Sequence, residues 1–396
     1  MSTLIKGKGC FMSTKLDIPS ARGEYAVQFA DSHEQVQETL SAFIKAKNPS
    51  SIVLFSNQQV FSLYGKAIQS VCQGCSNTVY LFPDGEEFKT VATIVEAISV
   101  LDKQSLDRKT LFVALGGGLV GDMTGFLASI FLRGVDWIQI PTTLLAMVDS
   151  SVGGKTGVNL GSGKNRLGSF YAPNLVCSSP EFLHTLDPKE VQAGMGEVIK
   201  HAILDSQELC IEVQKMVKVL IANQWKLTPE HSLPVDILIK ICAVKASVVA
   251  EDEREKGIRA WLNYGHSIGH AIEKCLQYQG VLHGQAVLLG MWIESAWTMQ
   301  QGWTASRVVE YLESFVKSID MSIEIKDTIT RMTLFDAISF DKKMQCDKLQ
   351  LVVIRDFGSV SLRSLDTAEI QSLVAFAVHY LHQFFDTQYI ISSRHS

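Results

Sequence analysis

Two histidines four residues apart, His266 and His270, follow a turn-forming Tyr-Gly pair. Residues at this spacing share one face of a helix, and paired imidazoles there commonly bind metal ions. His283 precedes a glycine at the predicted start of the next helix, and Glu197 follows glycines in an earlier one. Three of these four side chains could form a catalytic zinc site with open positions. Spacing alone favours His266 and His270 as the ligand pair, whereas the alternative is a set of core histidines hydrogen-bonded to backbone.

A glycine-rich turn stands between an apolar strand and a helix. Gly116, Gly118 and Gly121, with Gly117 between the first two, satisfy the pattern GxGxxG. A turn without side chains lets backbone N–H groups approach a pyrophosphate at a helix N-terminus, which predicts a dinucleotide site. The turn follows two earlier strand–helix units, and no acidic residue ends a strand about 20 residues later, as a ribose contact would require. The alternative is a turn that needs glycine only for close packing.

Polar and cationic residues stand near two other strand ends. Asp84 to Lys89 follows the preceding strand, where a carboxylate could bind a ribose hydroxyl or cap a helix. The stretch 141–166 is rich in Gly, Ser and Thr and contains Lys155 and Lys164. Small residues mixed with cations form phosphate cradles, although a single lysine is more often a solvated surface charge. Gly-Lys-Thr at 154–156 resembles the end of a P-loop, but the upstream glycine spacing of an ATPase is missing.

Two kinds of structure must position these groups. Apolar strands alternate with helices in the first half, which predicts a mostly parallel, Rossmann-like sheet covered on both faces. The second half is typical of a mainly helical domain, beginning with an N-cap Asp-Pro at 187–188. We expect an α/β cofactor-binding domain over residues 1–185 and a helical metal- and substrate-binding domain over residues 186–396. The expected strands are 51–56, 78–82, 110–115, 135–140 and 349–354, and the expected helices are 60–73, 88–103, 118–132, 188–205, 208–222, 234–251, 260–278, 284–301, 304–319 and 367–384.

Composition limits the class of protein. The 396 residues suffice for two domains, and a hydrophobic content of 46% predicts a large core. Lys and Arg total 36 against 41 Asp and Glu, a balance that argues against a nucleic-acid partner. The chain has no apolar run of membrane-spanning length and no signal-peptide pattern, so we expect a cytoplasmic protein without a membrane partner. The Cys72–Cys75 spacing could form a redox or zinc pair, but no second pair completes it, and incidental spacing is favoured.

In combination and in order, these motifs resemble the 3-dehydroquinate synthase family of the sugar-phosphate cyclase superfamily. The resemblance covers nearly the whole chain apart from the N-terminal segment and the tail. The sequence around Asp341-Lys342-Lys343 also fits a later family motif. The matching segments are 116–122, 141–156, 163–165, 197–200 and 263–270.

The resemblance implies a lyase of the shikimate pathway, which supplies aromatic amino acids. Its members convert a phosphorylated sugar acid, 3-deoxy-D-arabino-heptulosonate 7-phosphate, to 3-dehydroquinate and phosphate. The implied steps are alcohol oxidation, phosphate elimination, carbonyl reduction, ring opening and aldol closure, with the substrate's own phosphate as the eliminating base. NAD is restored in each turnover, and a divalent metal is required, with zinc expected and cobalt possible. A homodimer is also implied.

The resemblance assigns roles residue by residue. It implies Glu197, His266 and His283 as metal ligands, which overrules the choice of His270 by spacing and makes His270 an active-site residue. The implied substrate-site or catalytic residues are Arg133, Asp149, Lys155, Asn165, Lys200, Lys245, Arg259, Asn263, His270 and Lys343 or its neighbour Lys342. The implied NAD-binding residues are Asp84, Gly85, Glu86, Lys89, Gly116, Gly117, Gly118, Gly121, Asp122, Thr142, Thr143, Lys155, Lys164, Phe182 and Thr185.

Three positions depart from the family pattern. Gln285 replaces the Glu that commonly follows His-Gly, which puts in doubt the charge around the metal, and Asn57 stands where Asp is frequent. Tyr171-Ala172-Pro173 replaces a common Gln-Pro ending. The alternatives are another sugar-phosphate cyclase, a metal-dependent polyol dehydrogenase that releases NADH, or a binding protein without activity.

Overall fold

The chain forms two compact units in a computed structural model. The structure describes residues 14–72, 75–161, 163–255, 257–318, 328–339, 344–345 and 348–392, with only the backbone for 344–345 and 386–392. The first unit consists of Met1–Pro141, Gly154–Glu181 and Pro234–Ala243. The second consists of Thr142–Gly153, Phe182–Leu233 and Val244–Ser396. The chain therefore passes between the units several times.

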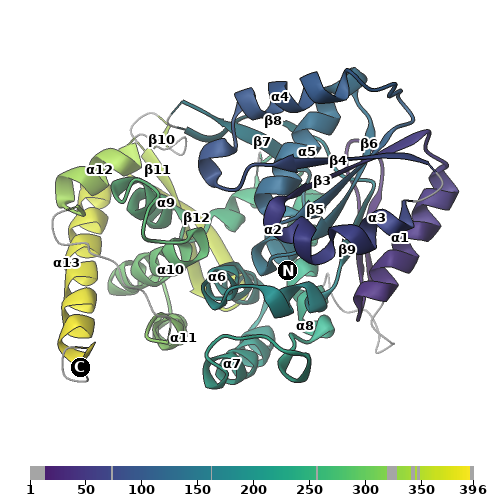
Figure 1. The fold of residues 1–396 in the computed structure, drawn as a ribbon. Coiled ribbons are helices and arrows are strands. Elements are labelled where there is room, and N and C mark those ends of the chain that lie inside the picture. The colour runs from purple at the N-terminus through teal and green to yellow at the C-terminus, as the bar shows by residue number, and fades with distance from the viewer. Residues whose placement is uncertain are drawn as a thin grey trace. The chain divides into compact units, whose positions relative to one another are not determined.

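A seven-stranded sheet forms the centre of the first unit (Figure 1). All neighbouring strands are parallel except the pair β1–β2 at one edge. The predicted mostly parallel sheet is thus confirmed, and the sequence reasoning missed β1, β2 and β9. In spatial order the strands are β1 (Lys15–Ile18), β2 (Tyr25–Phe29), β9 (Leu175–Ser178), β6 (Asp136–Pro141), β5 (Leu111–Gly116), β3 (Ser51–Asn57) and β4 (Ser76–Phe82).

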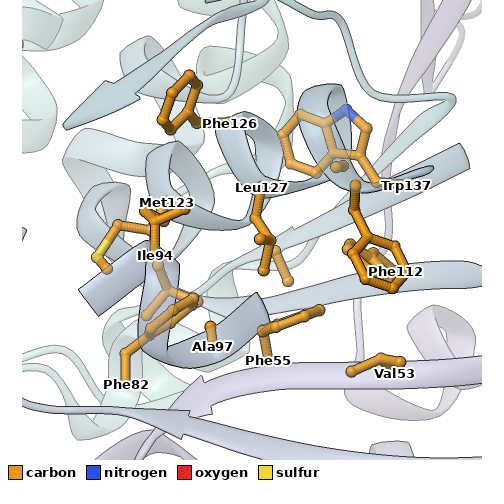
Figure 2. Packing of buried hydrophobic residues seen from close by; sticks show 14 of the residues in the cluster. Val53, Phe55, Phe82, Ile94, Ala97, Phe112, Met123, Phe126, Leu127 and Trp137 are labelled. Atoms are coloured by element: carbon orange, nitrogen blue, oxygen red, sulfur yellow. The ribbon is translucent and has the colours of Figure 1, made fainter. Parts of the chain in front are cut away.

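Helices cover the two faces of this sheet. Right-handed crossovers place α4 (Val91–Leu101) and α5 (Gly118–Ile130) on one face, and α1 (His33–Lys47) and α3 (Lys66–Val71) lie on the other (Figure 1). A cluster of buried apolar residues lies between the sheet and α4–α5: Phe55, Phe112 and Trp137 of the strands pack against Ile94 and Leu127 of the helices (Figure 2). This burial fixes the first turn of α5 against the strand that precedes it.

The strand order changes direction between β3 and β5. The chain runs from β3 outward to β4 and then crosses back to β5 on the opposite side of β3. Ligands of open α/β sheets bind beyond the carboxyl ends of the strands at such a switch point. Gly116, the last residue of β5, stands at this switch point, which explains why the glycine turn follows β5 and not the first strand of the sheet.

The lysine-containing stretch of small residues forms an antiparallel hairpin. Its strands are β7 (Lys155–Leu160) and β8 (Gly163–Phe170), which the sequence did not predict as strands. The hairpin packs closely on α5 because Gly125 faces Thr156: a Cβ on this glycine would lie 2.4 Å from the Thr156 methyl carbon. Cations embedded in this stretch are therefore held on a rigid two-stranded element.

The second unit is mainly helical, as predicted. The predicted strand 349–354 is one half of a hairpin, and the predicted helix 260–278 is interrupted at Gly265, whose φ of 77° ends the 3-10 helix Ile258–Asn263 before α9. No helix among the described residues is long and apolar enough to cross a bilayer. The elements are α6 (Pro188–Asp205), α7 (Gln207–Ala222), α8 (Val235–Glu251, which lies partly in the first unit), α9 (His266–Cys275), α10 (His283–Gln300), α11 (Ser306–Val316), α12 (Arg331–Ser339), α13 (Thr367–Ser392) and the strands β10 (Met344–Gln345), β11 (Lys348–Asp356) and β12 (Ser359–Leu365).

Candidate metal centre and cofactor-binding groups

Glycines beside the predicted metal ligands are the contact points of three helices. A Cβ on Gly196 of α6 would lie 2.1 Å from the carbonyl oxygen of Gly284 in α10. A Cβ on Gly290 of α10 would lie 2.0 Å from the carbonyl oxygen of Gly265, just before α9. Side chains at these positions would push the backbones apart. The helices can therefore pack closely at the positions next to Glu197, His266 and His283.

The predicted ligand atoms meet inside this helix packing. Nε2 of His266 lies 3.7 Å and Nε2 of His283 lies 3.9 Å from the same oxygen of Glu197, Oε1. Zinc bonds of about 2 Å to nitrogen and oxygen place ligand atoms roughly 3–4 Å apart. That oxygen is buried and accepts no hydrogen bond from any described residue. A buried carboxylate oxygen that faces two imidazole nitrogens and has no hydrogen-bond donor among the described residues fits a divalent cation, because a buried polar atom needs a partner.

Both histidines are turned so that Nε2 faces Glu197. Nδ1 of His266 donates to the carbonyl oxygen of Tyr264 at 3.0 Å, and Nδ1 of His283 lies 3.2 Å from Oε2 of Glu273. A ring nitrogen that donates its proton leaves the other as a lone pair for the metal. His270 packs beside both rings, with centroids 5.1 Å and 5.8 Å away. The structure brings all four predicted residues together, and the choice among the histidines stays a prediction.

Gln285, the departure from the family pattern beside the metal centre, acts within its own helix. Its Oε1 accepts a hydrogen bond from the backbone N–H of Leu282 at 3.1 Å, which closes the first turn of α10. A different buried acidic side chain, that of Glu273, contacts His283.

A buried group of charged residues adjoins the metal centre along α6. Nζ of Lys245 lies 2.7 Å from Oδ1 of Asp149, and Lys200 contacts Glu197 one helical turn away. Burial tends to raise the pKa of Asp149, but the charges of Lys245 and Lys200 outweigh it and hold the pKa well below its usual range. Asp149 is therefore an anion at neutral pH, and these predicted substrate-site residues lie next to the predicted metal ligands.

His201 belongs to this group, although the sequence reasoning missed it. It is fully buried, its Nε2 lies 3.6 Å from Oδ1 of Asp149, and neither ring nitrogen has a hydrogen-bond partner among the described residues. Burial and the charge of Lys200 lower the pKa of its imidazole well below 6.5, so the ring is neutral. Its position four residues after Glu197, on the same helix face, is the signal that could have found it.

The remaining predicted residues of the second unit are placed less uniformly. Arg259 is buried and donates from Nη2 to the carbonyl oxygen of Gly153 at 3.2 Å, and Asn263 donates to Glu255 at 3.0 Å. The side chain of Phe182 is buried. Of the three predicted threonines, Thr142 is buried, Thr143 accepts a hydrogen bond from the N–H of Ala146, and Thr185 is exposed. Lys342 and Lys343 lie outside the described residues.

The glycine turn opens α5 as predicted. Gly117 is the N-cap and offers no side chain to the first N–H groups of the helix, which leaves them for a ligand. The outer glycines meet a spatial demand: a Cβ on Gly116 would lie 2.7 Å from Val120, and one on Gly121 would lie 2.2 Å from Gln139 of β6. Close helix–sheet packing and an open helix N-terminus therefore occur at the same turn. A dinucleotide site and a packing requirement for glycine are thus compatible interpretations of the motif.

Lys89 joins three segments that carry predicted cofactor and substrate residues. Its Nζ lies 2.6 Å from Oδ2 of Asp122 on α5 and 2.6 Å from Oδ1 of Asn165 on the hairpin, and the side chain is buried. Asn159 of β7 donates to Glu86 at 2.9 Å and accepts from the N–H of Asn165 at 2.9 Å. The loop 84–89, the start of α5 and the hairpin thus form one polar cluster beside the glycine turn.

Arg133 occupies a strained turn directly after α5. Leu132, Arg133 and Gly134 have consecutive φ values of 49°, 68° and 117°. Side chains rarely adopt this region, and such strain persists only where the surroundings impose it. The turn holds Arg133 exposed at the end of the segment that begins with the glycine turn. Of the predicted lysines, Lys155 is the exposed first residue of β7, and Lys164 lies on β8.

Replacing Lys89 by Met is expected to weaken NAD binding and lower the melting temperature. The variant keeps the apolar length of the side chain but leaves Asp122 and Asn165 without their shared cation, a loss of about 1–3 kcal/mol. NAD titration and thermal denaturation measure both effects. Lys109→Met, at an exposed lysine of the same unit, is the control that should change neither. An unaltered NAD affinity in Lys89→Met would contradict the assignment of this cluster to the cofactor.

The Cys72–Cys75 pair shows no sign of a functional site. The thiol of Cys72 is buried and donates to the carbonyl oxygen of Ile68, and that of Cys75 donates to Pro49. Burial raises the pKa of Cys72 to about 11, which leaves almost no reactive thiolate at neutral pH. Neither cysteine belongs to a potential metal-binding group within the described part of the chain.

The fold and these groups define a class of enzyme with known structures. A 2-deoxy-scyllo-inosose synthase complexed with carbaglucose-6-phosphate, NAD+ and Co2+ has a TM-score of 0.78 at 25% identity, over 91% of this chain and 99% of that one. A 2-epi-5-epi-valiolone synthase from Streptomyces hygroscopicus with NAD+ and Zn2+ bound has a TM-score of 0.77 at 23% identity, over 91% and 97%. Glycerol dehydrogenase from Schizosaccharomyces pombe has the same fold, with a TM-score of 0.61 and 14% identity over 91% of each chain. The fold is therefore that of the sugar-phosphate cyclases, and alcohol dehydrogenases share it.

Sequence comparison identifies the family within this class. Residues 79–193 match the family model of the 3-dehydroquinate synthase N-terminal region, and residues 194–344 match that of the C-terminal region. The 3-dehydroquinate synthase of a Picosynechococcus strain is 34% identical over 88% of this chain and 95% of its own length. The 3-dehydroquinate synthase of Acaryochloris marina is 38% identical over 78% of this chain and 83% of its own length. The chain belongs to the 3-dehydroquinate synthase family, as its motifs predicted.

Proposed function

We propose that this chain is a lyase that converts 3-deoxy-D-arabino-heptulosonate 7-phosphate to 3-dehydroquinate and phosphate, with NAD recycled in each turnover. The observation that carries this proposal is the meeting of Glu197, His266 and His283 beside the Asp149–Lys245 pair in a member of this family. A metal centre alone would suit a polyol dehydrogenase equally well. A neighbouring cluster of lysines is what a substrate with a carboxylate and a phosphate requires.

The proposed division of work follows the two predicted domains. In the second unit, to which Asp149 also belongs, Glu197, His266 and His283 would hold a divalent metal, with zinc proposed and cobalt as an alternative. Such a metal, when bound, lowers the pKa of substrate hydroxyls and polarises a ketone. Lys200, held against Glu197, presents its charge at the edge of this centre. Asp149 keeps the Lys245 ammonium in a fixed place, where it can bind an anionic group of the substrate.

Within residues 1–185, the glycine turn would bind the NAD pyrophosphate. The open N-terminus of α5 supplies backbone N–H groups, and the Lys89 cluster fixes the loop 84–89 and the hairpin around it. Arg133, Lys155 and Asn165 would contact the substrate phosphate, with Asn165 held in place by Lys89 and Asn159. Retaining the substrate through oxidation, elimination and reduction requires several such contacts, because each intermediate must stay bound.

The decisive experiment is incubation of the metal-loaded protein with the seven-carbon substrate and NAD at a small fraction of the substrate concentration. We expect phosphate release in large excess over NAD, with no net NADH accumulation. NADH that accumulates in step with product would overturn the proposal in favour of a polyol dehydrogenase. The control is the same mixture without NAD.

Another sugar-phosphate cyclase activity is the second candidate. It is supported by the similarity to 2-deoxy-scyllo-inosose synthase, whose structure contains carbaglucose-6-phosphate. Hexose 6-phosphates tested in the same assay separate the two: phosphate release from a hexose phosphate alone would favour this alternative. The identity of 34–38% to 3-dehydroquinate synthases favours the first candidate.

We also propose that the protein is a cytoplasmic homodimer whose partners are small molecules. The proposal rests on family membership and, for the compartment, on the six cysteines that the structure describes as free thiols. Light scattering in solution tests the dimer, because one chain has a mass of 43.7 kDa. A single species with this monomer mass would overturn it.

A further inference from the structure

A second buried carboxylate lies behind the metal centre. Glu273 is on the last turn of α9, and its side chain is 4% exposed. Its Oε2 lies 3.2 Å from Nδ1 of His283, the first residue of α10. The side chain of His283 is 32% exposed, more than that of His266 at 12%. A ligand at a helix end with this freedom loses rotamer entropy when it binds a metal, unless another contact fixes it beforehand.

The contact with Glu273 decides which nitrogen of His283 faces the metal site. When Nδ1 carries the proton and donates it to the carboxylate, Nε2 is left with its lone pair, 3.9 Å from Oε1 of Glu197. A negative acceptor also draws positive charge onto the ring and makes Nε2 a stronger donor to a cation. In the equivalent place, Nδ1 of His266 contacts a neutral acceptor, the carbonyl oxygen of Tyr264. The two predicted ligands are therefore supported unequally.

We propose that Glu273 is a positioning residue that orients His283 and raises the affinity of this centre for a divalent cation. The inference rests on the proposed metal centre and goes beyond it, because Glu273 is not a ligand. It places a second carboxylate beside the ligand set, behind His283, in addition to that of Glu197.

A purely structural role for Glu273 is less consistent with the surrounding contacts. The helices α9 and α10 are already joined by Glu294, whose carboxylate accepts from the N–H groups of Gly265 and Ile268, each at 3.0 Å. The hydroxyl groups of Tyr264 and Ser295 lie 2.5 Å apart and add a further link. Because these contacts hold the start of α9, loss of the Glu273 charge should leave the metal-free fold in place.

The test compares wild-type protein with Glu273→Gln and Glu273→Ala. Metal affinity is measured with Co2+ by competition against a chromophoric chelator, and the absorption spectrum of the bound cobalt reports the ligand geometry. Gln can still accept the Nδ1 proton but has no charge, whereas Ala does neither. We therefore expect affinity to fall about 10-fold for Gln and up to about 100-fold for Ala, with an altered cobalt spectrum. The melting temperature of the metal-free protein should change little in the Gln variant.

Glu294→Gln is the matched control, since it neutralises a buried carboxylate of the same helix pair that contacts backbone instead of a ligand. We expect it to lower the metal-free melting temperature more than Glu273→Gln and to weaken cobalt binding less. Wild-type affinity in Glu273→Gln and Glu273→Ala would overturn the inference, as would equal losses in Glu273→Gln and Glu294→Gln. Failure of the proposed function alone gives a different result: an inactive wild-type protein that still binds cobalt, with the affinity lowered in the Glu273 variants.

Discussion

Removal of the divalent metal is expected to abolish turnover, and addition of zinc or cobalt is expected to restore it. A bound metal contributes several kcal/mol of charge stabilisation, and about 4 kcal/mol corresponds to a factor of roughly 10³ in rate. His283→Ala removes one imidazole from the group that faces Glu197, so its kcat should fall by at least about 10³. Phosphate release after dialysis against a chelator, with and without added metal, measures the first effect.

This experiment distinguishes loss of the metal from loss of the folded structure. Zinc should reactivate the dialysed wild-type protein but not His283→Ala, while both should keep their melting curves and NAD affinity. His231→Ala is the matched control, because this histidine is exposed and outside the cluster. Full activity of His283→Ala, or of the thoroughly dialysed wild type, would contradict the metal assignment.

Replacement of Asp149 by Asn is expected to lower both stability and turnover. The carboxylate is the counter-charge of Lys245, whose side chain is 9% exposed, and it also faces the buried Lys200 and His201. Loss of one partner of a buried pair costs about 3–5 kcal/mol. The Asp149 side chain is itself 25% exposed, so we expect a smaller loss, about 2 kcal/mol of unfolding free energy. Misplacement of Lys245 should raise KM for the anionic substrate as well.

The stability effect of Asp149 should depend on pH. The pKa of its carboxyl is lowered in the folded protein, so its contribution is complete above the pKa of an unfolded aspartate, about 4. The contribution is lost as the pH falls below that value toward the folded pKa. Denaturant unfolding of wild type and Asp149→Asn should therefore show a constant gap between pH 5 and 8 that narrows in more acidic solution.

An exposed aspartate provides the comparison for this result. Asp102→Asn removes a carboxyl at the end of α4, and we expect less than about 0.5 kcal/mol of change. A gap for Asp149→Asn that widens in acid would mean that the carboxyl is protonated in the native protein. That outcome would remove the basis for treating Asp149 as the anion that fixes Lys245.

Local patterns carried much of what could be predicted. The parallel sheet followed from apolar strands alternating with helices, and α6 was predicted with its observed bounds from its Asp187 cap and Pro188. The glycine turn was predicted from a few adjacent residues, although its place at the β3–β5 switch point needed the strand order. The pairing of β11 with β12 and the break at Gly265 were missed, because apolar periodicity does not report a partner strand or a positive φ.

What the sequence determined by itself was the family and the residue types available for chemistry: a glycine turn, a set of lysines, and Glu197 with three histidines. These signals are short, so neighbouring residues suffice to encode them. The tertiary structure alone decided which groups act on one another. Lys245 reaches Asp149 across 96 residues, Glu273 contacts His283, and Gln285 caps its own helix. Such pairs depend on how closely the helices pack. The glycines at the helix crossings allow this close packing because they have no side chain.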